Sequence, residues 1–210
     1  MNMRVRTDLA ALLAERKAVV GGQARYRYDL VQAARAFWDG GSLDEWITEM
    51  DQVVQEGLWR AWLQGAASVG VEEGDLNEEE QARFGEIVNE QMSYIDAFGF
   101  FIQDLRQREQ SFDAVLTRLE LWANTYTEVV NEARVVAGRD TKLKWVLGPV
   151  KTEHCESCLK LEGRVYRAST WDKFDIRPQH PLLTCGGWNC ACTLRPTDEP
   201  CDKGRPPGLP

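Results

Sequence analysis

The first 138 residues repeat apolar side chains at the three- and four-residue spacing of amphipathic helices. The clearest stripe follows Ser42-Leu-Asp-Glu45, a capping box in which each side chain satisfies a backbone amide of the other residue. The stripe comprises Leu43, Trp46, Ile47, Met50, Val53, Val54, Leu58 and Trp62. A second stripe follows Ser111 and runs from Phe112 to Ala133 before the stop at Gly138. Both patterns predict helices with one buried face.

Glycines and acidic residues divide the rest of this half into further helices. We expect one helix over residues 7–20 that begins at Thr7, a break at Gly21-Gly22, and a second helix over residues 23–38. Asn77 precedes three glutamates, which suit the positive end of a helix dipole. We expect this helix to continue to about residue 108, with a bend at Gly99.

The pattern changes after Gly138. Residues 142–147 alternate polar and apolar side chains, which predicts a strand with one buried face. Residues 164–167 and 191–194 are two further candidate strands. The C-terminal part of the chain is therefore expected to combine short strands with the end of a helix.

These patterns predict a fold that is mainly α in its N-terminal half, with a small C-terminal α+β domain. The expected division is a helical domain at 1–138, a cysteine-rich α+β domain at 139–196, and a flexible, proline-rich tail at 197–210. The net charge of −8 is uneven, with −11 on residues 1–140 and +3 on residues 141–210. An acidic body disfavours non-specific DNA binding, and no apolar run is long enough to suggest a membrane span.

The cysteines carry the strongest chemical signal, because all six follow residue 150. Cys155 and Cys158 form a Cys-x-x-Cys knuckle, and Cys190 and Cys192 form a second close pair about thirty residues later. Two short loops that each present two thiolates can hold one tetrahedral Zn²⁺ with no open position, which makes such a site structural. Metal-binding energy then folds a module too small to bury a core alone. The sequence predicts a zinc-knuckle-like module with these four ligands.

The second half of the site is open to alternatives. In a straight strand, residues two apart lie on one face but about 6.6 Å from each other, too far for two ligands of one ion, so Cys190 and Cys192 share an ion only if the chain turns there. Alternate ligands are Cys185, which precedes two glycines, His180 and His154. Reduced cysteines without a metal and disulfides formed outside the cell are the competing interpretations.

The sequence contains no recognisable catalytic set. His154-Cys-Glu156 matches the His-x-Glu half of zinc deaminases, but their downstream Pro-Cys-x-x-Cys is missing. The sequence has no P-loop, no Gly-x-Ser-x-Gly and no His-Glu-x-x-His. A cysteine–histidine nucleophile pair using Cys155 or Cys185 is not selected by anything else in the chain. We therefore expect a protein that is not an enzyme and has no small-molecule substrate.

Residues from about 119 to 196 carry a series of short motifs in a defined order. These are Thr127-Glu128, Asn131-Glu-Ala133, Lys144-Trp145, Cys155-Glu-Ser-Cys158-Leu-Lys-Leu161-Glu-Gly163-Arg-Val165, Asn189-Cys190-Ala-Cys192 and Pro196. In order and spacing, this segment resembles the C-terminal domain of phage head morphogenesis proteins of the Mu F-type minor head protein family. Two features depart from that pattern: Ala191 replaces the usual arginine, and His180-Pro181 lies about ten residues ahead of Cys190 rather than directly before the pair.

The resemblance implies a structural role as a minor capsid or head morphogenesis protein of a tailed phage or prophage. Such a protein belongs to the virion head and to the host cytoplasm during assembly. The implied partners are portal, scaffold or major capsid proteins, with packaged DNA as a further contact and ejection with the DNA as a further option. The alternative from another class is a zinc-ribbon nucleic-acid-binding protein that uses the basic region at 141–210.

Overall fold

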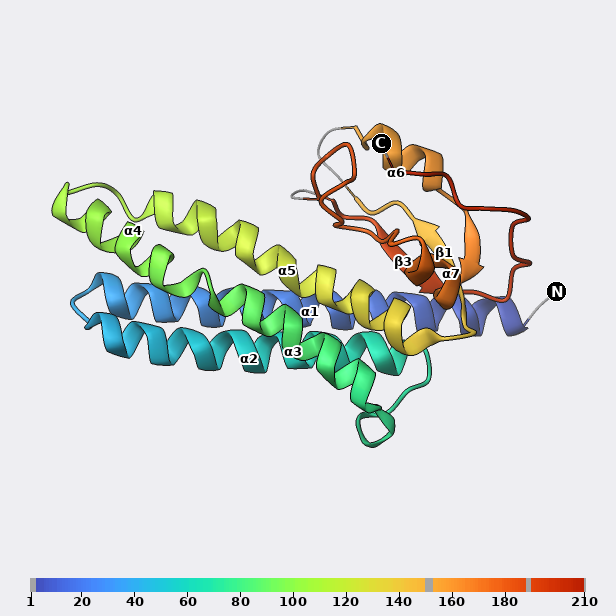
Figure 1. Ribbon diagram of the computed structural model, residues 1–210, viewed down its shortest axis with the longest axis horizontal. Helices are drawn as coiled ribbons and strands as arrows, with labels where there is room; N and C mark the ends of the chain where they lie inside the picture. Colours follow the sequence, from blue (N-terminus) through green and yellow to red (C-terminus); the bar gives the residue numbers. More distant parts are fainter. Residues whose placement is uncertain (1–2, 150–152, 188–189, 210) are drawn as a thin grey trace. The chain divides into compact units, whose positions relative to one another are not determined.

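A computed structural model describes residues 3–149, 153–187 and 190–209, and for residues 3–20 it describes the helical backbone alone. The N-terminal half contains helices α1 (Met3–Trp38), α2 (Leu43–Ser68), η1 (Glu73–Asp75, a 3-10 turn), α3 (Glu78–Met92), α4 (Ile95–Gln107) and α5 (Asp113–Gly138). The C-terminal part contains β1 (Lys142–Val146), α6 (Glu156–Leu161), β2 (Val165–Arg167), α7 (Ala168–Lys173) and β3 (Thr193–Pro196) (Figure 1). The predicted fold class is confirmed.

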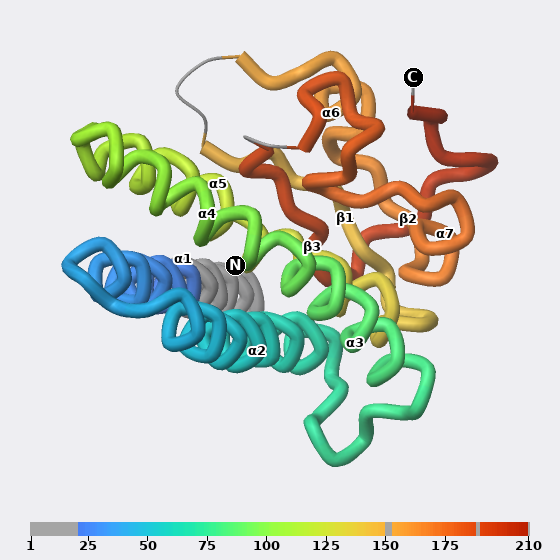
Figure 2. Tube along the Cα trace, turned by 60° about the vertical axis from the view of Figure 1, so that its left-hand side comes forward, coloured from blue at the N-terminus to red at the C-terminus, as the bar shows by residue number. Residues whose placement is uncertain are grey.

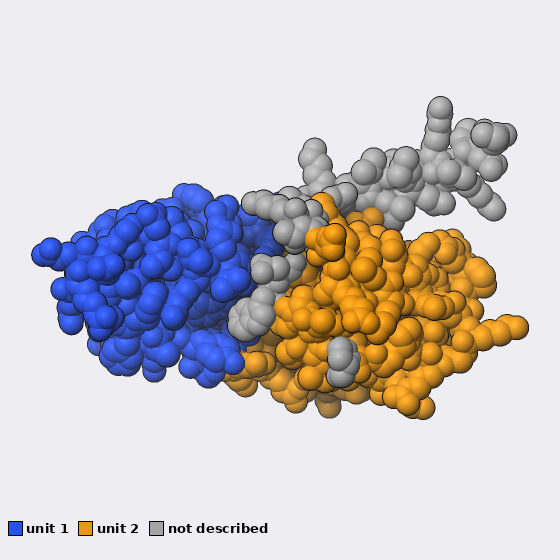
Figure 3. All heavy atoms as spheres, turned by 90° about the horizontal axis from the view of Figure 1, so that it is seen from above, with its two compact units in different colours: residues 1–61, 91–126 blue, residues 62–90, 127–210 orange. Residues whose placement is uncertain are grey.

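The chain forms two compact units, which Figure 3 colours separately. Unit 1 comprises residues 1–61 and 91–126, and unit 2 comprises residues 62–90 and 127–210. The cysteine-rich segment therefore folds together with α3 and with the C-terminal ends of α2 and α5, whereas the sequence-based division had placed it alone. Within the described residues, no helix is both long and apolar enough to cross a bilayer.

Three of the predicted helix starts, at Ser42, Asn77 and Ser111, are confirmed by side-chain caps. The Ser42 amide donates to Glu45 Oε2 at 2.9 Å, and the Glu45 amide donates to Ser42 Oγ at 3.2 Å. At the start of α3, the Asn77 amide donates to Glu80 Oε2 and the Glu80 amide donates to Asn77 Oδ1, each at 2.9 Å. Ser111 Oγ accepts the Asp113 amide at 3.1 Å at the start of α5. These side chains replace the partners that the first amides of a helix lack.

The core of unit 1 is aromatic. Trp46 stacks on Phe37 with ring centroids 5.3 Å apart and packs edge-to-face on Phe98 at 5.9 Å. Its indole Nε1 donates to the Ile95 carbonyl at 3.2 Å, which satisfies the one polar atom of a fully buried ring. Trp46 of the α2 stripe is thus core, as its helical spacing predicts.

The predicted boundaries of α1 are wrong. The helix is continuous through Gly21-Gly22 and begins before Thr7. Gly22 lies under Tyr126 of α5, and a Cβ added there would be 2.1 Å from the tyrosine hydroxyl oxygen. The glycine therefore allows α1 and α5 to pack closely. This packing outweighs the cost of about 1 kcal/mol that glycine carries inside a helix relative to alanine.

The helix expected over residues 77–108 is two helices. The chain turns at residues 93–94, between α3 and α4, and not at Gly99. Gly99 lies inside α4, where a Cβ would be 2.8 Å from Trp46 Nε1. The turn directs α3 into unit 2 and α4 into unit 1, so each helix buries its apolar residues in a different core.

Unit 2 is built on a three-stranded antiparallel sheet in the order β2-β1-β3. Leu143 and Trp145 of the central strand are fully buried, and Trp145 lies opposite Leu194 of β3. Trp171 of α7 packs on Trp145 with ring centroids 5.9 Å apart and donates from Nε1 to the Leu143 carbonyl at 3.0 Å. Cys158 and Cys192 belong to this same core cluster. The sheet and α7 thus form an apolar core that includes Cys158 and Cys192.

The C-terminal residues 197–209 are not the free tail that their composition predicts. The Asp202 amide donates to the Val165 carbonyl at 2.8 Å, and the Val165 amide donates to Asp202 Oδ2 at 2.9 Å. Leu209 packs against the core cluster of unit 2. Because β2 is an edge strand with unpaired backbone groups, the segment finds partners that composition alone does not reveal.

We predict opposite effects for alanine at two helical glycines of unit 2. A Cβ at Gly65 would be 2.4 Å from the Val130 carbonyl oxygen, whereas a Cβ at Gly85 meets nothing within 4 Å. Gly65→Ala should therefore lower the free energy of unfolding by about 1–3 kcal/mol. Gly85→Ala should raise it by up to about 1 kcal/mol through helix propensity. Thermal melting followed by circular dichroism compares the two; equal midpoints would contradict the close packing of α2 on α5.

Candidate metal centre

Five of the six cysteines converge in unit 2. Cys155 is the residue before α6 and Cys158 lies within it, while Cys185, Cys190 and Cys192 come from the long segment between α7 and β3. Figures 1 and 2 both show this segment beside α6. The sixth cysteine is exposed and belongs to no such group among the described residues. Two loops distant in sequence therefore place their thiols together.

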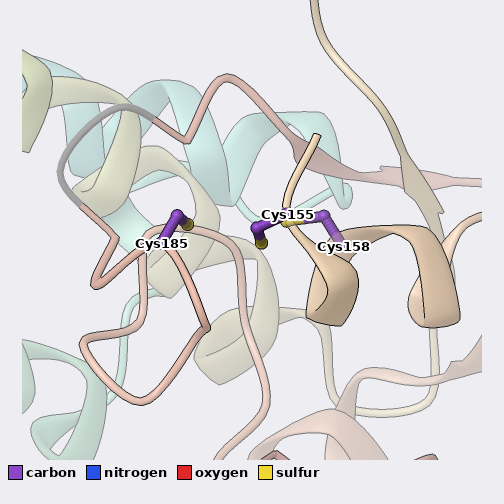
Figure 4. A group of neighbouring side chains, drawn as sticks. All are labelled: Cys155, Cys158 and Cys185. Atoms are coloured by element: carbon purple, nitrogen blue, oxygen red, sulfur yellow. The ribbon is translucent and has the colours of Figure 1, made fainter. Parts of the chain in front are cut away.

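The sulfurs form two groups of three that share one member. The Sγ atoms of Cys155, Cys158 and Cys185 lie within 4.8 Å of one another, and Figure 4 shows these side chains converging. The Sγ atoms of Cys158, Cys190 and Cys192 form the second group, in which Cys158 Sγ is 3.6 Å from Cys190 Sγ. Zinc–sulfur bonds of about 2.3 Å place tetrahedral thiolates about 3.8 Å apart. The clusters could therefore hold a metal ion.

The four predicted ligands are distributed over both groups. Cys155 belongs to the first, Cys190 and Cys192 to the second, and Cys158 to both. Cys185, expected as an alternate, is a full member of the first group. Residues 190–192 precede the first residue of β3, so they are not held at the spacing of an extended strand, and both thiols reach Cys158. The neighbouring residues 188–189, including Asn189 of the closing motif, lie outside the described residues.

The two histidines expected as alternate ligands, His154 and His180, have different hydrogen-bond partners. His180 Nε2 pairs with Asp175 Oδ2 at 3.0 Å, and His180 Nδ1 accepts the Leu182 amide at 3.1 Å. With both ring nitrogens engaged, His180 is not placed as a ligand, and that alternate is wrong. His154 Nδ1 lies 3.8 Å from Cys192 Sγ, at the edge of the second group.

Hydrogen bonds favour a thiolate at the buried end of the cluster. The thiols of Cys158 and Cys190 donate toward Cys192 and lower its pKa, and the Gly148 amide acts in the same direction. The pKa of Cys158 is raised, because its hydrogen bonds to Cys190 and Cys192 hold its proton. Protons held between the closely packed sulfurs limit their negative charge. A divalent cation would bind by displacing these protons.

Burial and hydrogen bonding act differently on the pKa values of Cys155 and Cys185, the two partly exposed thiols of the first group. Burial raises the pKa of Cys185 to about 11. At Cys155, burial acts to raise the pKa, but hydrogen bonds from the backbone and thiol of Cys158 and from Cys185 outweigh it and lower the pKa. Donation by the first turn of α6 is consistent with the ordinary stabilisation of thiolates at Cys-x-x-Cys motifs. The first group therefore also contains a preferred thiolate position.

Two glycines allow the second cysteine loop to pack closely on its neighbours. A Cβ at Gly148 would be 1.7 Å from the Ala191 carbonyl oxygen. A Cβ at Gly187 would be 2.1 Å from the Gln179 carbonyl oxygen, and Gly187 has a positive φ of 79° that favours glycine. The sequence drew attention to Gly187 only as one of the two glycines after Cys185 and did not single out Gly148, because a glycine by itself gives no indication of what backbone lies against it.

Two buried side-chain amides, those of Asn131 and Gln179, connect α5 to the loop that carries Cys190 and Cys192. Asn131 Nδ2 of α5 donates to Gln179 Oε1 at 2.8 Å, and Gln179 Nε2 donates to the carbonyls of Cys190 at 2.5 Å and Cys192 at 2.9 Å. Asn131 Oδ1 also accepts the Leu194 amide at 2.9 Å. Asn131 appears in the sequence motifs, whereas nothing in the sequence identifies Gln179. Both are buried, so their amides fix the path of the loop.

We predict that Asn131→Leu and Gln179→Leu each lower the free energy of unfolding by about 1–3 kcal/mol, because buried groups lose their partners. The double variant should lose less than the sum, since their mutual hydrogen bond is lost only once. Urea unfolding of the double-mutant cycle measures this coupling. Gln52→Leu, which removes an exposed amide, is the control and should change stability little. Strict additivity would show that the two amides do not act as one network.

Comparisons with known proteins found no match to a family model, to a curated protein or to a solved structure. The interpretation of the centre therefore depends on its own chemistry, in which five sulfurs form two groups of three that could each hold a metal ion.

Proposed function

We propose that the sulfur cluster is a structural zinc centre in a minor capsid or head morphogenesis protein of a tailed phage or prophage. The observation that supports it is the approach of the Cys155–Cys158 knuckle to the loop that carries Cys185, Cys190 and Cys192. These are the same two elements that the motif resemblance pairs across the C-terminal domain. The family role is supported by that order of motifs.

Zinc is the ion that best suits this donor set. Thiolates are soft ligands, and cytosolic cysteines remain reduced and available to a metal. Cys158 is 2% exposed and Cys192 is fully buried, so the inner part of the centre has no access for a substrate. With five thiols for four coordination positions, no position is reserved for a reacting water. The centre is therefore structural and not catalytic.

The role of the ion is to hold a segment that has little regular structure. The described residues between α7 and β3 contain no helix or strand. Their path is determined by the amides of Asn131 and Gln179, by the Ser157 Oγ–Thr184 Oγ1 hydrogen bond of 2.6 Å, and by the sulfurs. Metal binding joins this segment to α6 and contributes directly to folding.

The surface beside the centre suits contact with other head proteins. Leu159 of α6 is 54% exposed and Leu182 of the cysteine-bearing segment is 59% exposed. Large apolar side chains held exposed on a metal-stapled scaffold are typical of protein interfaces. Portal, scaffold and shell proteins are the proposed partners.

The zinc-ribbon alternative has less support, because five of the eleven basic residues at 141–210 are already paired with carboxylates. A phosphate-binding surface needs cations that are free to face the nucleic acid. The ion pairs are Lys144 with Glu199, Lys160 with Glu156, Arg164 with Asp202, Arg167 with Asp140, and Arg177 with Glu132. A net charge of +3 distributed in this way favours protein partners over DNA.

The head role predicts that the chain is a component of phage particles. After induction of the host, density-purified heads should contain the chain at low copy number, detected by quantitative mass spectrometry. The purified full-length chain should bind duplex DNA weakly at low salt. Absence from the heads, together with salt-dependent retention on DNA, would replace the capsid role with the nucleic-acid one.

The structural role of the metal predicts the effect of Cys158→Ser, because Cys158 belongs to both sulfur groups. This variant should lose bound zinc, and the cysteine-bearing part of unit 2 should become sensitive to protease while the helices of unit 1 remain folded. Elemental analysis, limited proteolysis and circular dichroism measure these effects. Cys201→Ser is the matched control, because Cys201 is exposed and outside both groups. Equal zinc content and protease resistance in the two variants would show that Cys158 is no ligand.

A further inference from the structure

We propose that the five-cysteine cluster binds two divalent d¹⁰ ions that share the Cys158 thiolate. This inference rests on the proposed zinc centre and specifies its composition. One ion is held by Cys155, Cys158 and Cys185, and the other by Cys158, Cys190 and Cys192.

The first argument is geometric. A single tetrahedral ion requires four sulfurs with all six separations near about 3.8 Å. Among the described residues, which include all six cysteines, the sulfurs within 4.8 Å of one another form two sets of three and no set of four. Each set has the size of one face of a coordination tetrahedron. Two ions therefore fit the arrangement with less movement than one.

The second argument is the position of Cys158. It is the only residue common to both sets, and it lies between the knuckle and the second loop with 2% of its surface exposed. A thiolate sulfur has more than one lone pair, so it can bond to two ions at once. A central, buried sulfur with neighbours on both sides is in the position that a bridging ligand requires.

The third argument is charge. One ion bound by four thiolates leaves a net charge of −2 and a fifth thiol without a partner beside the coordinated sulfurs. Two divalent ions with five thiolates leave a net charge of −1. Because unbalanced charge is costly in a site that is partly removed from water, the second ion reduces the electrostatic penalty.

The test is the metal content of the full-length chain after loading with Zn²⁺ and gel filtration against a weak chelator. We expect two ions per chain by native mass spectrometry and elemental analysis. Cys185→Ser and Cys192→Ser should each retain one ion, and Cys201→Ser should retain two. After loading with ¹¹³Cd²⁺, the spectrum should show two resonances coupled through the shared sulfur.

The outcomes separate this inference from the function on which it rests. One ion in the wild-type chain, with an unchanged content in Cys185→Ser or Cys192→Ser, would overturn the shared-thiolate arrangement and leave a single structural zinc. No bound metal in the wild-type chain would overturn both. Two ions without ¹¹³Cd coupling would place them in separate sites and would also overturn the sharing of Cys158. The metal content and the ¹¹³Cd spectrum are measured first on the wild-type chain, so these measurements do not depend on the folding of a variant.

Discussion

The structure of unit 2 depends on the close approach of cysteine sulfurs from two loops that are about thirty residues apart. Each sulfur that loses its proton carries a charge into a region shared with Trp145, Trp171 and Leu194. Such a cluster is tolerable when protons or a cation balance it. Cys158 and Cys192 are part of the apolar core and the other three cysteines pack against it, so the candidate metal centre and the core of the unit share residues.

Buried polar side chains of α5 help to position the cysteine-bearing segment. Asn131 is on α5 and reaches the cysteine loop through Gln179, so a helix of the N-terminal half positions residues that follow it by some sixty places. Glu132, its neighbour on α5, pairs with Arg83 of α3 and with Arg177. The cysteine-bearing segment is therefore supported by buried polar contacts before any ion is considered. This explains why it shares a unit with α3 and the end of α5.

The proposed assembly role depends on two features of unit 2, the clustered sulfurs and the exposed leucines on the elements that carry them. Leu159 and Leu182 are held on the two elements that the centre joins. Loss of the metal would therefore disorganise the surface proposed to meet portal, scaffold or shell proteins, which links folding of the module to assembly.

The sequence by itself determined the helical character of the N-terminal half, the three strands, the capping box at Ser42–Glu45 and the residue types of the centre, because these follow from local periodicity and side-chain chemistry. It placed the break of α1 wrongly at Gly21-Gly22, since only the ring of Tyr126 explains a glycine there. The membership of Cys185, the engagement of His180 by Asp175, and the anchoring of the C-terminal segment on β2 were decided by tertiary structure alone. Each of these depends on which groups meet across long separations in the chain, and local pattern contains no information on that.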